Sequence, residues 1–340
     1  MGEPADVVVV GAGVMGLAAA WALRRAGREP LVLEQFQIGH TRGSSHGATR
    51  IFRLAYDEPE WVRLAQEALP LWRELEAESD ETLLDFTGLL DLRDDLDRLT
   101  QTLDACGAVC ELLTAEEVQH RFGLATECCE AVFQPEAGVV FADRSVRALR
   151  TGLLVREETR VRALVPGTDG VRVDTDAGPI DAETVVVAAG AWARPMLADA
   201  GIDLPVVVTR ETVSYFRLAD ERDVPSVIDY VNRETYALTG GPGLVKVGVH
   251  RSGPVVDPQE AGSGPDAEIV AFEAEWAART YELDRAEPVE VETCLYTNTA
   301  DTSFVLERHG PIVVCSACSG HGFKFAPAVG ERVAALVTMT

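Results

Sequence analysis

The stretch "DVVVVGAGVMG", residues 6–16, is the strongest indication of the fold, because a run of β-branched residues is followed at once by three spaced glycines. The run has the pattern of a buried strand, and the glycines have the pattern of a tight turn. The apolar residues that follow predict a helix that ends on Gly27, and "PLVLE" at 30–34 predicts a second strand. A strand, a turn, a helix and a strand in this order predict the βαβ unit of a dinucleotide-binding domain.

The turn between the first strand and the helix offers a cradle for a pyrophosphate. Gly11 permits the sharp turn, Gly13 lets the backbone approach the phosphates, and Gly16 allows the helix to pack closely. Glu34, eighteen residues after Gly16, is placed to accept hydrogen bonds from a ribose hydroxyl and would repel the 2′-phosphate of NADP. The cradle favours a dinucleotide without distinguishing FAD from NAD, and a turn that binds nothing is the alternative.

The composition indicates a globular protein of about two domains, with 340 residues of which 47% are apolar. A formal net charge of -25 repels phosphate backbones and argues against a nucleic-acid partner, so an anionic substrate would need a local cluster of cations. The acidic start "MGEPAD" and the glycines within the apolar run 7–23 argue against a signal peptide or a membrane segment. The seven cysteines, an odd number without regular spacing, predict free thiols and a cytoplasmic location.

The rest of the chain predicts helices and strands that suggest a second, β-rich domain. The expected elements are a helix near 61–75, a capping box in "TAEE" at 114–117, strands at 86–92, 109–113, 171–175, 184–188, 206–216, 243–250 and 287–297, and a helix near 267–279. The strand at 184–188 ends in small residues, which leave room for a bound ring system.

Only two of the thirty basic residues are lysine, namely Lys246 and Lys324, and both stand among apolar residues and glycines. A compact ammonium fits a tight pocket in which a guanidinium has no room, so both lysines are candidates for a functional site. Lys324 precedes a helical pattern, whose N-terminus and loop amides would stabilise negative charge on a bound ring. For Lys246, the alternative is a side chain that points to solvent from an alternating strand.

Five motifs, in order along the chain, carry a resemblance to a known family. They are "GAGVMG" with Glu34, "GSSHGATRIFR" at 43–53, "GLVKVGVH" at 243–250, "CLYTNT" at 294–299 and "SGHGFKF" at 319–325. Together they resemble the monomeric sarcosine oxidase and N-methyltryptophan oxidase family of FAD-dependent amine oxidases. Because the motifs run from residue 11 to residue 325, the resemblance covers almost the whole chain.

The resemblance implies an α/β fold, with a Rossmann-like FAD-binding domain and a smaller substrate domain built on an antiparallel β-sheet. It divides the chain into an FAD-binding domain at 1–83, 143–209 and 298–340 and a substrate domain at 84–142 and 210–297. It also implies that FAD lies extended with its ADP half on the glycine cradle, and that a thioether joins the flavin to Cys294. A thiol must ionise to form such a bond, which requires cations or dipoles nearby. An inert buried thiol is the alternative.

The resemblance also assigns roles to single residues. It places the substrate carboxylate between Arg53 and Lys324, and it makes Lys246 the residue that activates O2. A fixed positive charge favours the first electron transfer to O2, because that step forms an anion. The other matching positions are Arg50 and His46 beside the flavin, Tyr236 and His250 near the substrate, and Thr49, Gly320, His321, Gly322 and again Lys324 against the cofactor. For the histidines, a structural hydrogen bond is the alternative role.

The implied activity is oxidation of the C–N bond of a secondary-amine amino acid to an imine, with O2 reduced to hydrogen peroxide. The partners would be a small amino acid and O2, without nucleic acid or membrane, and the resemblance favours a monomer. A flavin dehydrogenase or a multi-electron imino-acid oxidase on the same scaffold, and a non-enzymatic dinucleotide-binding protein, are the alternatives. Cys315 and Cys318 form a C-x-x-C that would suit redox or metal chemistry, but no second pair completes a zinc site, so we expect no metal.

Two departures from the resemblance bear on domain packing more than on chemistry. The chain ends soon after the helix expected past Lys324, and the segment 145–161 lacks a few residues of the usual helix. The loop that carries Tyr236 is one residue shorter than the family pattern.

Overall fold

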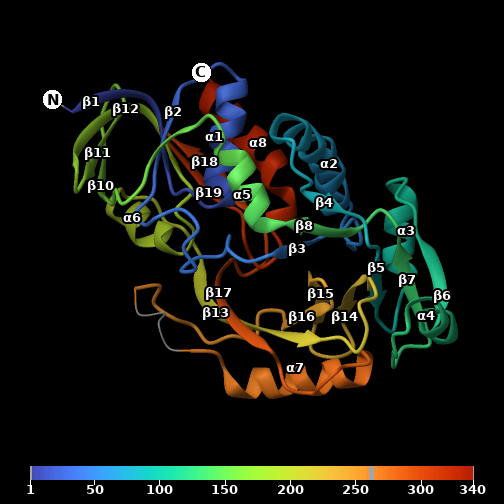
Figure 1. Cartoon of the computed structure of the whole chain (residues 1–340). Helices are drawn as coiled ribbons and strands as arrows, with labels where there is room; N and C mark the ends of the chain where they lie inside the picture. Colours follow the sequence, from blue (N-terminus) through green and yellow to red (C-terminus); the bar gives the residue numbers. More distant parts are fainter. Residues whose placement is uncertain (1, 260–263, 340) are drawn as a thin grey trace.

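The computed structural model describes residues 2–259 and 264–339. It contains two large β-sheets and a small third one, with helices packed around the first large sheet and along one face of the second (Figure 1). This arrangement confirms the predicted α/β class. No helix in the described ranges has the length and apolar character needed to cross a bilayer.

The first sheet is the dinucleotide-binding type that the opening motif predicts. Its strand order is β10-β11-β12-β1-β2-β9, and β19 with β18 continues it beyond β12. The strands are β1 (Glu3–Val10), β2 (Pro30–Leu33), β9 (Leu154–Arg156), β10 (Val161–Pro166), β11 (Val171–Thr175), β12 (Gly178–Val187), β18 (Val305–His309) and β19 (Ile312–Ser316). The apolar run at the end of β1 is buried on both faces, as a central parallel strand requires.

The four central strands of this sheet end at one edge. β1 runs parallel to β2 and β12, and β12 runs parallel to β19. In register, Val10 lies beside Leu33 on one side and Val187 on the other, and Val187 lies beside Val314. Ligands of such sheets bind outside the carboxyl ends of the strands.

Two helices, α1 (Val14–Arg25) and α8 (Ala326–Thr338), pack together against the first sheet. Glycines permit their close approach: a Cβ on Gly16 would lie 1.9 Å from the Gly11 carbonyl oxygen, and a Cβ on Gly330 would lie 2.4 Å from the Ala18 carbonyl oxygen. α2 (Pro59–Ser79) packs against α8 and α5 (Ala142–Arg150) packs against α1, whereas α6 (Ala193–Asp199) covers the opposite face of the sheet. α2 covers the predicted helix near 61–75 and contains Pro70.

The second sheet has the order β17-β13-β16-β15-β14-β5-β7-β6, and α7 (Ala267–Thr280) packs along it (Figure 1). The strands are β5 (Leu89–Leu92), β6 (Glu111–Thr114), β7 (Glu130–Gln134), β13 (Val207–Arg217), β14 (Ser226–Asp229), β15 (Thr235–Gly241), β16 (Leu244–Val249) and β17 (Glu290–Asn298). The sheet is antiparallel except that β14 and β5 run parallel.

The third sheet joins β3 (Thr49–Phe52), β8 (Gly138–Phe141) and β4 (Leu84–Asp85). It draws β3 from the first predicted domain and the other two strands from the second, so the division into domains stays a prediction. Beyond it lie α3 (Asp97–Ala105) and α4 (Ala115–Phe122). The capping box predicted at 114–117 is confirmed, because the Thr114 hydroxyl and the Glu117 carboxylate each accept a hydrogen bond from the other's backbone N–H.

Candidate active site

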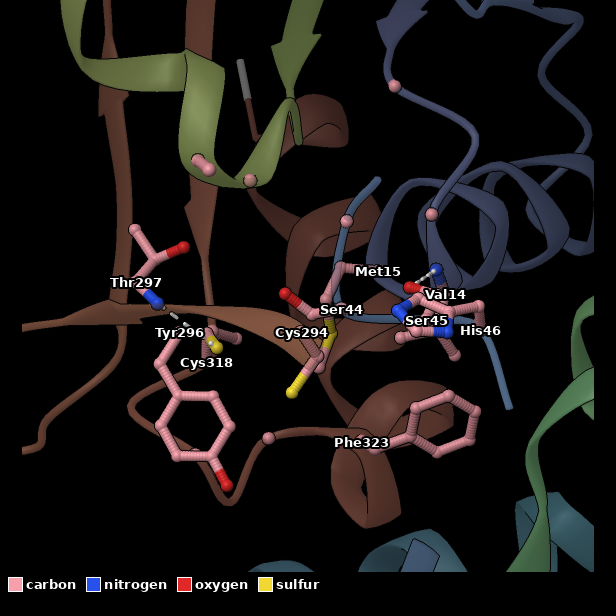
Figure 2. A pocket seen from close by; sticks show the side chains of 18 of the residues that line it. Val14, Met15, Ser44, Ser45, His46, Cys294, Tyr296, Thr297, Cys318 and Phe323 are labelled. Carbon is pink, nitrogen blue, oxygen red and sulfur yellow. Dashed lines mark hydrogen bonds between the residues drawn. The ribbon is translucent and has the colours of Figure 1, made fainter. Parts of the chain in front are cut away.

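A cavity of about 970 Å³ opens at the carboxyl ends of β1, β2, β12 and β19 and extends to the second sheet. Figure 2 shows side chains from four separate parts of the chain around this space: the start of α1, the loop 44–46, β17 and the turn at Phe323. All the residues predicted for the site line the cavity except Gly16, which instead packs against Gly11. The fold therefore brings together residues that are up to about three hundred positions apart in the sequence.

The glycine-rich turn at the start of α1 forms one end of the cavity. Gly11 has a φ of 103°, and a Cβ there would lie 2.6 Å from the Ala188 carbonyl oxygen, so only glycine fits. Gly13 is the residue before the helix and has no capping side chain of its own. The Val14 N–H instead donates a hydrogen bond to the Ser45 hydroxyl at 3.0 Å (Figure 2). Such a helix start attracts the phosphates of a dinucleotide.

Glu34 lies at the end of β2 and has a structural role that the sequence did not predict. Its carboxylate is buried and accepts hydrogen bonds from the backbone N–H groups of Ala12 at 2.8 Å and Phe36 at 3.0 Å. It therefore holds the glycine-rich turn against the next strand while it lines the cavity.

The loop before β3 is organised by Arg50. The guanidinium donates hydrogen bonds to the backbone carbonyls of Thr49, Ser44 and His46, at 2.8, 2.9 and 2.7 Å. The Thr49 hydroxyl is buried and donates to the Thr239 carbonyl at 2.6 Å, which ties the loop to the second sheet. Because backbone carbonyls are its hydrogen-bond partners, Arg50 keeps its positive charge available to the cavity.

Both ring nitrogens of His46 are buried, and no hydrogen-bond partner for them is found among the described residues. Burial, and then the neighbouring Arg50, lower the pKa of His46 to about 4, so the imidazole is neutral at neutral pH. An unpartnered buried ring of this kind leaves a donor and an acceptor for a bound group.

Lys246 stands on β16 with its ammonium towards the cavity, 5.4 Å from the centre of the Tyr215 ring. The residue is only 5% exposed, so the solvent-pointing alternative is wrong. Burial and Arg50 lower the pKa of Lys246 to about 8, against the opposing effect of Cys294 and Glu292. With that pKa, most of the ammonium is charged at neutral pH.

Cys294 lies on β17 and lines the same cavity (Figure 2). Burial raises the pKa of its thiol to about 11, although Arg50 and Lys246 act in the opposite direction. The expected cations are therefore present, but burial outweighs them and the free thiol is protonated at neutral pH. The other cysteines are free as well, and no cluster of metal ligands occurs within the described ranges.

Arg53 and Lys324 form a cationic pair at the far end of the cavity. Arg53 donates to the Tyr230 hydroxyl at 3.2 and 3.3 Å and lies 3.7 Å from the buried carboxylate of Asp91. Lys324 donates to the Tyr56 hydroxyl at 2.8 Å and to the His321 carbonyl at 2.7 Å. Burial, and then Arg53, place the pKa of Lys324 well below its usual range. Arg53 thus has one buried acid beside it, whereas the hydrogen-bond partners of Lys324 are a hydroxyl and a backbone carbonyl.

The remaining predicted residues surround this cationic end. His250 packs near Tyr296, with ring centres 5.7 Å apart, and both lie so close to Gly320 that a Cβ there would come within 2.5 Å of each. Burial lowers the pKa values of His250 and His321 to about 3, so both rings are neutral at neutral pH. A Cβ on Gly322 would lie 1.9 Å from the Ala317 carbonyl oxygen, and Tyr236 is a cavity residue whose pKa is raised by burial.

Several residues of the site were not predicted from the sequence. Asp91 stands among leucines in the strand "GLLDL". An acid in such an apolar strand is expected to be buried with a charged partner, and this pattern could have predicted its ion pair. Asp91 bonds Arg93 in a bidentate ion pair at 2.6 and 2.9 Å, beside the contact with Arg53. Glu292 lines the cavity two positions before Cys294, on the same face of β17, and accepts a hydrogen bond from Tyr215 at 2.7 Å.

Comparison with known proteins identifies the family. A family model described as "FAD dependent oxidoreductase" matches residues 6–336, nearly the whole chain. The protein belongs to this family. The monomeric sarcosine oxidase of Bacillus sp. (strain B-0618) is 33% identical over 362 residues, which cover 97% of this chain and 91% of the relative. The peroxisomal sarcosine oxidase of Homo sapiens is 32% identical over 96% of this chain and 90% of the relative.

A solved structure with a similar fold supports the same family assignment as these sequence comparisons. The structure of NikD, described as an unusual amino acid oxidase essential for nikkomycin biosynthesis, superposes with a TM-score of 0.88 and is 29% identical, covering 99% of this chain and 94% of NikD. The predicted family, fold class and FAD cofactor are confirmed.

The residues of the cavity fit FAD on their own geometry. Gly11, Gly13 and the start of α1 line the cavity, as a pyrophosphate cradle requires, and the volume of about 970 Å³ is at the upper end of the range for ligand sites. The cations Arg50 and Lys246 and the unpartnered nitrogens of His46 would lie along the bound group.

Proposed function

We propose that this FAD-dependent oxidoreductase oxidises the C–N bond of a secondary-amine amino acid, of the N-methyl or cyclic type, and passes the electrons to O2. One observation carries the proposal: a single cavity joins the glycine-rich turn to the cationic pair Arg53 and Lys324, with Lys246 also on its wall. The sarcosine oxidase relatives and the likeness to NikD support an amino acid as the substrate.

The overall reaction balances without another reagent. One substrate amine and one O2 give one imine and one hydrogen peroxide, and water then hydrolyses the imine to a carbonyl compound and an amine. FAD, when bound, supplies the two-electron acceptor between substrate and O2.

Arg53 and Lys324 bind the substrate carboxylate in this proposal. The planar guanidinium can form two parallel hydrogen bonds, and the ammonium adds a compact charge. Tyr230 and Tyr56 hold the two cations in place. Because burial and Arg53 lower the pKa of Lys324, an arriving carboxylate would favour the charged form of Lys324. Fixing the carboxylate fixes the direction of the C–H bond next to nitrogen.

The other cavity residues divide between substrate and cofactor. His250 and Tyr236 would contact the substrate near its nitrogen, and a neutral imidazole there can accept or donate a hydrogen bond without adding repulsion. Arg50 and His46 would lie beside the flavin, where Arg50 favours negative charge on the reduced ring. Lys246 would favour the electron transfer to O2 for the same electrostatic reason.

Cys294 is our proposal for a covalent link to the flavin. The thiol must lose its proton before it can attack, and Arg50 and Lys246 are the nearby cations that favour the thiolate. Because burial raises the pKa of the free thiol to about 11, little thiolate is present at neutral pH and the attack would need these cations.

A flavin dehydrogenase on the same scaffold is the second candidate. The observation in its favour is Glu292, whose carboxylate lies in the same cavity as the ammonium of Lys246 and opposes its charge. A poor reaction with O2 and good turnover with an artificial electron acceptor would identify this alternative.

The deciding experiment combines spectroscopy with a peroxide assay. Purified protein should show the absorbance of bound flavin and should release peroxide with one or more of sarcosine, N-methyltryptophan, pipecolate and proline. Oxygen uptake and peroxide formation should be equal in moles. Protein without flavin absorbance, or with flavin that none of these amines reduces in the absence of O2, would contradict the proposed function.

A further inference from the structure

Three charged side chains surround the backbone of Gly47 at the edge of the cavity. A Cβ on Gly47 would lie 3.5 Å from an Arg50 guanidinium nitrogen, 3.6 Å from the Glu292 Oε2 and 3.9 Å from the Lys246 Nζ. Because both atoms lie close to this one point, the Glu292 Oε2 and the Lys246 Nζ are separated by no more than 3.6 Å and 3.9 Å taken together. They do not form a direct ion pair, since none within 4.0 Å joins them in the described part of the chain.

The Lys246 ammonium makes no hydrogen bond or ion pair with any described residue, so the neighbouring charges act on it through space. The groups that face it are Arg50, Cys294, Glu292 and Asp143, together with the ring of Tyr215. Only two of these groups are carboxylic acids. Asp143 already accepts a hydrogen bond from the Gly47 backbone, and burial raises its pKa.

Tyr215 fixes the position of Glu292 relative to Lys246. In the second sheet Tyr215 is the cross-strand neighbour of Lys246, on the adjacent strands β13 and β16. Its hydroxyl reaches the other neighbouring strand, β17, and donates a hydrogen bond of 2.7 Å to the Glu292 Oε2. Glu292 is thus held by a donor that leaves its full negative charge in place.

We propose that Glu292 is a positioning residue that reduces the positive potential at Lys246 and thereby sets how fast the bound flavin reacts with O2. This inference rests on the proposed function. Reduction of O2 starts by forming an anion, so a carboxylate beside the activating ammonium slows that step. The chemistry is unchanged: two electrons and two protons convert one O2 to hydrogen peroxide, and Glu292 neither gains nor loses a bond.

The test compares Glu292→Gln with the wild type in three measurements on the flavin-containing protein. The first is the dissociation constant of sulfite, an anion that adds to oxidised flavins. The second is the midpoint potential of the flavin, and the third is the rate constant for its reoxidation by O2. At a pH well below 8, where Lys246 is charged, loss of one unit charge about 12 Å from the reacting ring, at an effective dielectric of about 20, should tighten sulfite binding about tenfold and speed reoxidation by a similar factor. The same tenfold factor corresponds to a rise of about 30 mV in a two-electron potential.

Two control variants separate charge from packing. Glu290→Gln removes a carboxylate from the exposed start of the same strand and should leave all three values within about twofold. Tyr215→Phe removes the hydrogen bond but keeps the charge of Glu292, so sulfite affinity should change less than in Glu292→Gln. If Glu292→Gln does not fold, Glu292→Asp, which keeps the charge, should match the wild type, and a tenfold change in that variant would overturn the proposal.

The outcomes distinguish the inference from the function on which it rests. Unchanged sulfite affinity and potential in a flavin-containing Glu292→Gln protein would overturn the inference alone. An equal change in Tyr215→Phe would also overturn it, because packing would then explain both variants. A wild-type protein without flavin would contradict the proposed function, and the inference that rests on it would fail as well.

Discussion

Replacing Lys246 by methionine should slow reoxidation of the flavin and leave its reduction by substrate almost unchanged. The side chain of methionine fills a similar volume without a charge. The role of Lys246 in the O2 step is purely electrostatic in our proposal, whereas the substrate carboxylate is bound by Arg53 and Lys324 at the other end of the cavity.

The size of the effect follows from burial. Because Lys246 is 5% exposed, its charge is poorly screened by solvent. A unit charge about 5 Å from a forming anion, at an effective dielectric of about 20, contributes about 3 kcal/mol. This energy corresponds to a loss of about 100-fold in the rate constant for reoxidation. The fold itself should not weaken, since the lowered pKa shows that burying the charged lysine is unfavourable.

Stopped-flow spectroscopy measures the two half-reactions separately. Flavin is first reduced by substrate without O2, and reduced enzyme is then mixed with O2 in buffer. Lys324→Met is the matched control, because Lys324 is the only other lysine in the chain. We expect that variant to bind substrate more weakly and to reoxidise at the wild-type rate.

The pH dependence gives a second test of the same reasoning. The pKa of about 8 for Lys246 means that the ammonium is charged below that pH and neutral above it. Wild-type reoxidation should therefore slow as the pH rises through about 8, while Lys246→Met should show no such step. A reoxidation rate within about threefold of the wild type in Lys246→Met would refute the assigned role.

Three further predictions concern other parts of the chain. Cys294→Ser should release its flavin on acid precipitation, whereas the wild type should keep the colour in the pellet; colour in the wild-type supernatant would contradict the thioether. Asp91→Asn should lower the free energy of unfolding by about 3 kcal/mol in urea, because it breaks a buried ion pair with Arg93; an unchanged midpoint would contradict this. Glu273→Gln should be more stable than the wild type at pH 9, by on the order of 3 kcal/mol, and similar to it at pH 5.

The sign of the Glu273 prediction follows from its surroundings. Its carboxyl group is buried between α7 and β13, accepts a hydrogen bond from the Ser214 hydroxyl at 2.5 Å and has a pKa raised by burial to about 8. The folded protein therefore holds this proton more tightly than the unfolded chain does. Stability from this group is complete below about pH 4.5 and is lost as the pH rises through about 8, so thermal melts at both pH values check the difference.

The features of this protein that depend on residues close together in the chain could be predicted from the amino-acid sequence. The strand, turn and helix at 6–27 follow from spacing within a few positions, and the structure reproduces them as β1 and α1. The same holds for the helix α7, the capping box at Thr114 and the family motifs that point to FAD. These features could be predicted because each depends on a short sequence pattern with one favourable conformation.

Which distant residues share the cavity became clear from the folded chain and not from the sequence. No pattern within the strand "EVETCLY" shows that Glu292 lies near Lys246, because that proximity depends on the pairing of β13 with both β16 and β17. The burial of Asp91 between Arg53 and Arg93, and the parallel pairing of β14 with β5, depend equally on chain crossings far from the residues involved. Charges interact through space, whereas sequence patterns describe only neighbours along the chain, so the balance of charge around Lys246 emerges only when the sheet has formed.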